Sequence, residues 1–418
     1  MKKIITSVSL VALGAASVQA AYAPGLSSAE RQKPWSVSAT LRGFYDDNYV
    51  TLWRDKKRES FGFEVSPSFA LNLTRDQTYV GLNYTYGMKF FEDRSKSRAD
   101  HSHQANAKLS HAFTPRYKLD VSDSFVVAQE PEILAPPGMA TVTAGSPLRT
   151  DGNNIRNSAK VTLGAWLMPD DLQAVAEYSN NMFDFEQTGK QSKSAFLDRV
   201  EHQFSLNMRW TLVPETVGVL GYQYGIIDYT SKDELANKHT PDERDNTSHY
   251  VFVGADHQFT KQLNALARVG LQYTEYDTVN KSSVNPYAEG NITWTYNPGS
   301  SINLGLRHSR SQTDVADSIG TGTPTLDAET TAAFVSLNHK IASKLNGSIL
   351  GQFSQSAFEL GKADNLAENM LLVGVNLSYE INKFLSAEAG YNFDRLDSDL
   401  DQRSFTRNRV YVGIRGSY

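Results

Sequence analysis

The chain has 418 residues, with 41 basic side chains against 46 acidic ones, a formal charge of −5 and no cysteine. This mild acidity gives no reason to expect a nucleic acid as partner, and the lack of cysteine excludes disulfides and thiol chemistry. Beyond the first residues no uninterrupted apolar stretch of about eighteen residues occurs, which excludes a helical membrane span.

The N-terminus is typical of an exported protein. "MKK" supplies a charged start, "IITSVSLVALGAAS" a short apolar run, and "VQA" or "AYA" a small-residue cleavage site. This order predicts a secretory signal peptide over residues 1–20, cleaved after Ala20 or Ala23. Residues 21–34 are then expected to form a short periplasmic segment before the first strand.

From residue 35 onward, apolar and polar residues alternate with a period of two. In "FGFEVSPSFALNL", residues 61–73, the odd positions are almost all apolar and the even positions are mostly polar or small. The segment "VEHQFSLNMRWT", residues 200–211, alternates in the same way. A helix would place apolar residues three and four apart, so the pattern predicts β-strands.

Short and long connections alternate between these strands. Short turns such as "TRDQ" and "NPGS" are followed by longer polar segments such as "SKDELANKHTPDERDN". An array of hairpins with one plain end and one elaborate end is typical of bacterial outer-membrane barrels. We predict eighteen strands, or sixteen to twenty if a hairpin is miscounted, near residues 35–45, 61–74, 78–91, 102–114, 117–128, 154–168, 171–184, 198–213, 216–229, 248–260, 263–276, 285–297, 300–310, 328–341, 345–358, 367–381, 384–395 and 405–418.

The predicted fold is therefore an all-β, closed, antiparallel up-and-down transmembrane β-barrel over residues 35–418. A soluble sandwich, propeller or β-solenoid is disfavoured, because many runs alternate for about ten residues, the length that a tilted strand needs to cross hydrocarbon. Pro67 interrupts the second strand and the alternation slips at Asp123. We expect a β-bulge at each of these two positions.

In such a barrel the apolar set faces lipid and the polar set faces the lumen. The polar set carries charges of both signs, and two interpretations stay open: a pore with weak anion preference, or charges that pair across the wall and cancel. The pore-lining candidates are Lys89, Lys108, Arg209, Arg268, Arg307, Arg409, Arg415, Glu64, Glu201 and Glu289.

The longest connection, residues 129–153, contains four prolines and apolar side chains that a purely solvated loop does not need. Ile133, Leu134 and Met139 would be buried if this loop folded into the lumen as a constriction. They would also be buried if the loop capped the mouth or met a partner, and we favour the lumen.

No catalytic constellation emerges from the sequence. His101 and His103 place two imidazoles on one strand face, but no third ligand with a defined spacing accompanies them, so we interpret them as an exposed pair at a loop edge. The other histidines are scattered, and they form no set with serine, asparagine or aspartate. We expect no enzymatic activity, cofactor or metal site.

The first strand carries a family resemblance. "SATLRGFYDDNYV", residues 38–50, runs into an aromatic–Asp–Asp–Asn end, and "EP" at Glu130–Pro131 opens the longest loop. Both features resemble the putative β-barrel porin 2 family over the whole mature chain. The resemblance implies an outer-membrane barrel, in some members linked to exopolysaccharide production, and no catalytic residues. Asp46, Asp47 and Asn48 match the pattern, and we interpret them as closing the first strand at the outer mouth.

The chain ends on "RNRVYVGIRGSY", whose alternation predicts a final strand with Tyr418 at the periplasmic interface. A terminal aromatic resembles the signal read by the outer-membrane barrel-assembly machinery. The predicted function is a porin-like channel for passive passage of small hydrophilic solutes or a polysaccharide strand; the alternative is a plugged structural or adhesive surface barrel. Outer-membrane lipid and the assembly machinery are the expected partners, while a homo-oligomer and a polysaccharide partner stay open.

Overall fold

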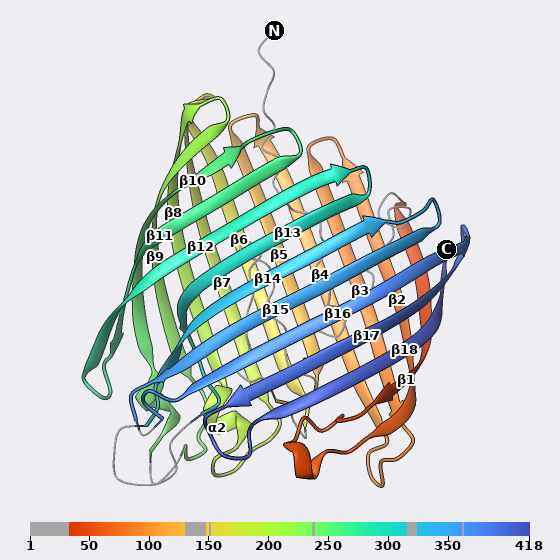
Figure 1. Cartoon of the computed structure of the whole chain (residues 1–418). Coiled ribbons are helices and arrows are strands. Elements are labelled where there is room, and N and C mark those ends of the chain that lie inside the picture. Colours follow the sequence, from red (N-terminus) through yellow and green to blue (C-terminus); the bar gives the residue numbers. More distant parts are fainter. Residues whose placement is uncertain (1–32, 130–147, 150–151, 236–238, 316–323, 362) are drawn as a thin grey trace.

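A computed structural model describes residues 33–129, 148–149, 152–235, 239–315, 324–361 and 363–418. In this part of the chain, eighteen strands form one antiparallel sheet, and β1 pairs with both β2 and β18. The sheet therefore closes on itself, and the predicted barrel is confirmed (Figure 1). The strands are β1 (Trp35–Asp46), β2 (Ser60–Arg75), β3 (Thr78–Phe91), β4 (Ala99–Thr114), β5 (Tyr117–Ala128), β6 (Asn154–Met168), β7 (Leu172–Phe185), β8 (Arg199–Val213), β9 (Thr216–Tyr229), β10 (Asn246–Gln258), β11 (Leu263–Tyr276), β12 (Lys281–Asn297), β13 (Ser300–Ser311), β14 (Asp327–Lys340), β15 (Leu345–Glu359), β16 (Ala367–Asn382), β17 (Leu385–Ser398) and β18 (Phe405–Ser417).

The two ends of the barrel differ in their connections, as predicted. Turns such as 76–77 and 298–299 are short, and they place Asp76 and Gly299 in the left-handed region at φ +49° and +80°. Tight hairpin turns need this conformation because it matches the twist of the flanking strands. The opposite end carries the long connections, whose described residues include three short helical turns, namely η2 (Arg54–Lys56), α2 (Lys193–Leu197) and η3 (Pro241–Arg244). None of the helices in the described residues has the length and apolar character to cross a membrane.

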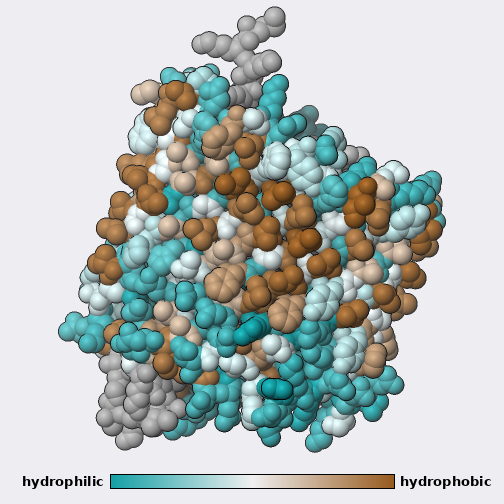
Figure 2. All heavy atoms as spheres, viewed as in Figure 1, coloured by the Kyte–Doolittle hydropathy of each residue, from teal (hydrophilic) through white to brown (hydrophobic). Residues whose placement is uncertain are grey.

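The exposed face of the wall is apolar. In β1, Val37 and Leu41 are 47% and 49% exposed, whereas Ser36 and Thr40, which alternate with them, are 2% and 8% exposed. Hydrophobic side chains gather in a band across the face shown in Figure 2, and the end that carries α2 is hydrophilic. A soluble fold would bury this band, so its exposure is the surface expected of a barrel solvated by lipid.

The expected bulges at Pro67 and Asp123 are wrong. The ladders shift register instead beside the short turns, where an extra residue lets a tight turn join strongly twisted strands. The shifts fall between Ala112 and Thr114, Trp166 and Met168, Thr211 and Val213, Trp294 and Asn297, and Glu380 and Asn382.

At Pro67 the register is unchanged on both sides, and residues 66–67 lack partners in β3. A proline has no N–H to donate, so the ladder is interrupted without a slip. Asp123 pairs with Ala107 and Ala159 in unbroken registers. Its carboxylate lies on the outward face of the barrel and accepts a hydrogen bond from Asn157 Nδ2 at 3.0 Å. The alternation therefore breaks because a polar residue stands on the outward face, while the register stays unchanged.

A larger interruption lies between β12 and β13. Their ladder stops at the pair Ala288–His308, although both strands continue toward the long connections. In the same register Pro286 would face Arg310, and a proline cannot supply the next ladder bond. Side chains bridge the gap instead: Asn285 accepts a hydrogen bond from Arg310 Nε at 2.5 Å.

The junction between the first and last strands is fixed at its outer end by a buried ion pair. Arg407 Nη2 and Nε lie 2.6 Å and 3.0 Å from Asp46 Oδ2, and both side chains are at most 2% exposed. The two residues are 361 positions apart in the chain, so this pair directly joins its two ends.

The two residues that follow β1, Asp47 and Asn48, extend this junction. Asp47 accepts hydrogen bonds from the Asn408 backbone N–H at 2.6 Å and from its side-chain amide at 2.7 Å. The fully buried Asn48 donates to the carbonyl oxygen of Thr406 at 3.0 Å. The Asp–Asp–Asn sequence thus binds β18 and its approach, in agreement with its interpretation as the closure of the first strand.

Replacing Arg407 by alanine should strongly destabilise the barrel, because Asp46 would be left buried without its counter-charge. Breaking a buried pair in this way costs about 3–5 kcal/mol. Urea unfolding of the refolded protein in detergent would measure the loss. The matched control is Asp397→Ala, which removes an exposed partner of Arg395 and should leave the midpoint unchanged. An Arg407→Ala midpoint equal to that of the wild type would contradict this role.

Candidate functional site

The inward face of the barrel is the candidate site. In β18, Val410, Val412 and Ile414 are exposed on the outward face, and Arg409 and Arg415 alternate with them. In each of the other strands concerned, the predicted pore-lining residue likewise alternates with exposed apolar side chains. All ten candidates therefore lie on the inward face, namely Lys89, Lys108, Arg209, Arg268, Arg307, Arg409, Arg415, Glu64, Glu201 and Glu289.

Asp256 in β10 joins two of these arginines. Arg209 Nη2 lies 2.7 Å from Asp256 Oδ2, and Arg268 binds the other carboxylate oxygen. Charge-assisted bonds to both oxygens fix the two guanidinium groups along the wall and leave the group with one net positive charge. Sequence reasoning missed Asp256, although the alternation of "HYVFVGADHQ" would have placed it inward between Ala255 and His257.

A second cluster lines the junction of β1 with its neighbours. Arg42 binds Glu388 through Nε and lies 3.5 Å from Glu64 Oε1 through Nη1. Its guanidinium also stacks on the Tyr411 ring at 4.9 Å, a cation–π contact. Here two carboxylates face one guanidinium, so this cluster offsets the positive charge of the Asp256 group.

Four further candidates also have partners on the inward face. They are Arg409 with Asp394 at 2.8 Å, Glu201 with Arg199 at 2.7 Å, Glu289 with the Tyr287 hydroxyl at 2.8 Å, and Arg415 with the Ser38 hydroxyl at 3.2 Å. Five of the ten candidates, Glu64, Glu201, Arg209, Arg268 and Arg409, are thus in ion pairs, whereas Glu289 and Arg415 are held by neutral hydroxyls.

Three inward cations depart from this pattern. Within the described residues, no carboxylate lies within ion-pair distance of Lys89, Lys108 or Arg307. Arg307 is exposed although it faces inward. The side chains that remain available to a solute thus include positive charges without a described carboxylate at ion-pair distance.

The long connections meet around Asp314, which lies between β13 and β14. Arg403, between β17 and β18, lies 2.8 Å from Asp314 Oδ1, and Lys193 of α2, between β7 and β8, binds the other oxygen. Strands β7 and β17 lie on opposite sides of the ring, so Asp314 bridges the mouth. Burial alone would raise the pKa of Asp314, but the two cations hold it well below its usual range.

Arg244 of η3 strengthens this bridge. It is fully buried and donates hydrogen bonds to the carbonyl oxygens of Thr313 at 3.0 Å and Phe196 at 3.2 Å. These contacts connect the β9–β10 connection with the β13–β14 connection and with α2. The predicted constriction residues Ile133, Leu134 and Met139 lie outside the described residues. The described part of the same connection is bound to its neighbours, since Arg149 Nη2 lies 2.5 Å from Asp100 Oδ2 and its backbone N–H donates to the Thr51 hydroxyl at 2.8 Å.

The histidine pair lies inside a strand, which corrects its expected place at a loop edge. His101 and His103 are exposed on the outward face of β4. Their Nδ1 atoms lie 2.7 Å and 2.9 Å from the hydroxyls of Tyr86 and Tyr84. Each imidazole is thus engaged by a tyrosine of β3, and among the described residues no group of three His, Cys, Asp or Glu side chains is arranged to hold a metal ion.

Residues 37–418 match the family described as Putative beta-barrel porin 2. The chain belongs to this family. The match and the closed eighteen-strand barrel make it a porin-like channel protein of the bacterial outer membrane, in contact with membrane lipid. The family and the fold are those of a channel rather than of an enzyme.

Several solved structures are similar to this chain at low identity. Acinetobacter baumannii OccAB4 is 11% identical with a TM-score of 0.47, and the alignment covers 93% of this chain and 100% of that one. For Pseudomonas aeruginosa OpdK the identity is 12%, the TM-score 0.43 and the coverage 92% and 99%. For Pseudomonas aeruginosa OccK2, solved with glucuronate, the values are 12%, 0.45, 92% and 98%. No curated protein matches the sequence.

The Asp314 bridge should resist mild acid. A carboxylate with a lowered pKa stabilises the folded mouth above its ordinary pKa, and this contribution is lost only as the pH falls through the lowered value. Tryptic cleavage of the porin at Lys193 and Arg403 should therefore be equally slow at pH 7 and pH 5, relative to a reference substrate at each pH. Asp314→Asn should accelerate it, and Asp397→Asn is the exposed control. Equal cleavage of Asp314→Asn and wild type would contradict the bridge.

Proposed function

We propose that this porin passes small hydrophilic solutes passively through its lumen. The observation that carries the proposal is the exposed, inward-facing Arg307, a charged side chain that reaches solvent inside the wall. An eighteen-strand barrel is wide enough to leave an aqueous channel rather than a core packed with side chains. The polar inward face supplies the surface that such solutes need.

We further propose a weak preference for anions. Half of the ten inward candidates are in ion pairs with described residues, and an ion pair contributes little net field along the pore. Lys89, Lys108 and Arg307 have no carboxylate at ion-pair distance among the described residues. Unpaired cations along a channel lower the electrostatic barrier for anions and raise it for cations.

The bridge across the mouth favours a second candidate, a barrel whose outer opening is narrow or closed. Asp314 joins connections from opposite sides of the ring through Arg403 and Lys193. On this alternative the protein would be a surface scaffold, and the 129–153 loop would add to the obstruction. Passage of a polysaccharide strand would require this bridge to open.

Planar-bilayer recordings separate these functions and test the selectivity. Wild-type protein should conduct and show an anion-selective reversal potential in a potassium chloride gradient. Arg307→Glu should shift the reversal potential toward cation selectivity, because it reverses an inward charge. Arg395→Glu makes the same charge change on the outward face near the long connections and should shift it less.

Absence of current from correctly folded wild-type protein would contradict the open channel and favour the closed barrel. Current that appears only in Asp314→Asn, or only after deletion of residues 132–150, would identify the obstruction. An unchanged reversal potential in Arg307→Glu would contradict the anion preference alone.

We also propose that Tyr418 serves as an assembly signal. Its backbone makes the last rungs of the junction, since its N–H donates to the Val37 carbonyl at 2.8 Å and its oxygen accepts from the Val37 N–H at 3.1 Å. Tyr418→Ala keeps these backbone bonds and removes only the ring. It should reduce membrane insertion in cells much more than Tyr379→Ala, which removes another exposed interface aromatic. Tyr418→Phe should insert normally, and equal effects of the two alanine variants would contradict a signalling role.

A further inference from the structure

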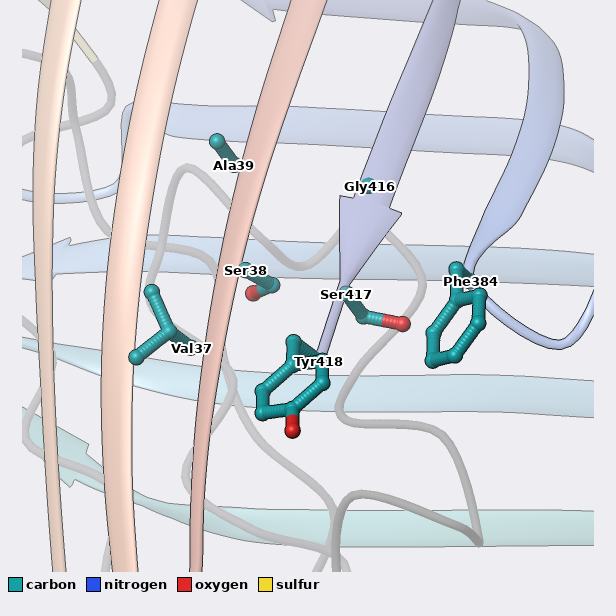
Figure 3. Close-up of a pocket in the computed structure, with 7 residues that line it drawn as sticks. All are labelled: Val37, Ser38, Ala39, Phe384, Gly416, Ser417 and Tyr418. Carbon is teal, nitrogen blue, oxygen red and sulfur yellow. The ribbon is translucent and has the colours of Figure 1, made fainter.

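An apolar hollow of about 520 Å³ lies where the first and last strands meet at the short-turn end (Figure 3). Its floor consists of small residues, and a side chain added at Gly416 would meet no atom closer than the Phe384 carbonyl oxygen at 4.0 Å. The residues that line it are Val37, Ser38, Ala39, Phe384, Gly416, Ser417 and Tyr418.

Two aromatic rings, Phe384 and Tyr418, line this hollow, and a third, Trp35, packs beside Tyr418. The Phe384 and Tyr418 rings are stacked, with centroids 6.1 Å apart, and the Trp35 centroid lies 5.7 Å from that of Tyr418. All three side chains are exposed on the outward face, and Figure 3 shows Phe384 and Tyr418 on either side of the end of β18. The hollow therefore opens toward the hydrocarbon, where only an apolar group can fill it without cost.

Two lysines stand at the rim. Lys33 Nζ lies 5.1 Å from the Tyr418 ring centroid, and Lys383 Nζ lies 4.7 Å from the Phe384 centroid. Neither ammonium forms an ion pair with a described residue. Positive charge thus lies directly beside an apolar depression.

We propose that this hollow binds an anionic phospholipid of the inner leaflet. One acyl chain lies over Ala39 and Gly416, against the edges of the Phe384 and Tyr418 rings, and the lipid phosphate is bound by Lys33 and Lys383. Shape alone would accept an acyl chain from any phospholipid. The two ammonium groups favour a lipid with net negative charge over a zwitterionic one.

The position of the hollow gives the bound lipid a structural consequence. Val37 and Ala39 belong to β1, Gly416 belongs to β18, and Phe384 precedes β17. A lipid seated here contacts both strands of the junction at the end opposite the Asp46–Arg407 pair. Its binding therefore stabilises the closed barrel in addition to solvating it.

Native mass spectrometry of the detergent-solubilised full chain tests this inference with dioleoyl phosphatidylglycerol and dioleoyl phosphatidylcholine as probes. Wild-type protein should retain one phosphatidylglycerol in preference to phosphatidylcholine. The double variant Lys33→Ala/Lys383→Ala should lose this preference by roughly fivefold per lysine, the weight of one basic residue at an anionic surface. Lys261→Ala, in another short turn, should retain it.

A second variant tests the hollow itself. Gly416→Trp should fill the space and abolish retention of both lipids, whereas Gly43→Trp, on the outward face of the same junction with nothing within 4 Å of an added Cβ, should leave it intact. Equal retention of the two lipids by wild type, or unchanged preference in the lysine double variant, would overturn the proposal. If Gly416→Trp blocked insertion in cells while the refolded protein still bound phosphatidylglycerol, the hollow would serve the assembly machinery and the lipid proposal would be wrong.

Discussion

Every backbone N–H and C=O in the membrane must find a partner within the protein, and the closed barrel depends on meeting this condition at the junction of β1 with β18. All other neighbouring strands are joined by a connection in the chain, but these two come from opposite ends of it. An open junction would expose two unpaired strand edges to lipid. The sequence places buried polar contacts here, and Asp46 with Arg407 holds the outer end.

Once the ring is closed, the period of two determines the chemistry of both faces. Each strand presents one set of side chains to lipid and the other to the lumen, so a charge on the wrong face is costly unless it has a partner. Asp123 shows this, because it faces outward and is bound by Asn157. On the inward face, carboxylates such as Asp256 hold arginines against the wall.

The strands, their faces and the closed barrel could be predicted from the sequence because each depends on residues two positions apart. The effect of a proline depends on more distant residues. Pro67 interrupts its ladder only locally, whereas the β12–β13 ladder does not resume beyond the level of Pro286, where Arg310 binds Asn285. The contacts between the long connections at the mouth could not be predicted in this way. Asp314 meets Lys193 and Arg403 across 121 and 89 positions, and only the closed ring brings them together.

The contacts that hold the two ends of the β1–β18 junction depend on what surrounds them. At the outer end, the buried Asp46 and Arg407 exclude both lipid and solvent, and their charges are stable there because they satisfy each other. At the short-turn end, the outward side chains of Val37 and Tyr418 lie beside hydrocarbon, while Arg415 donates to the Ser38 hydroxyl on the inward face. Aromatic rings and small residues cover the outward face there, and the lysines remain at the rim. The junction is thus held by charge and hydrogen bonds on its inward face and by apolar contact on its lipid face.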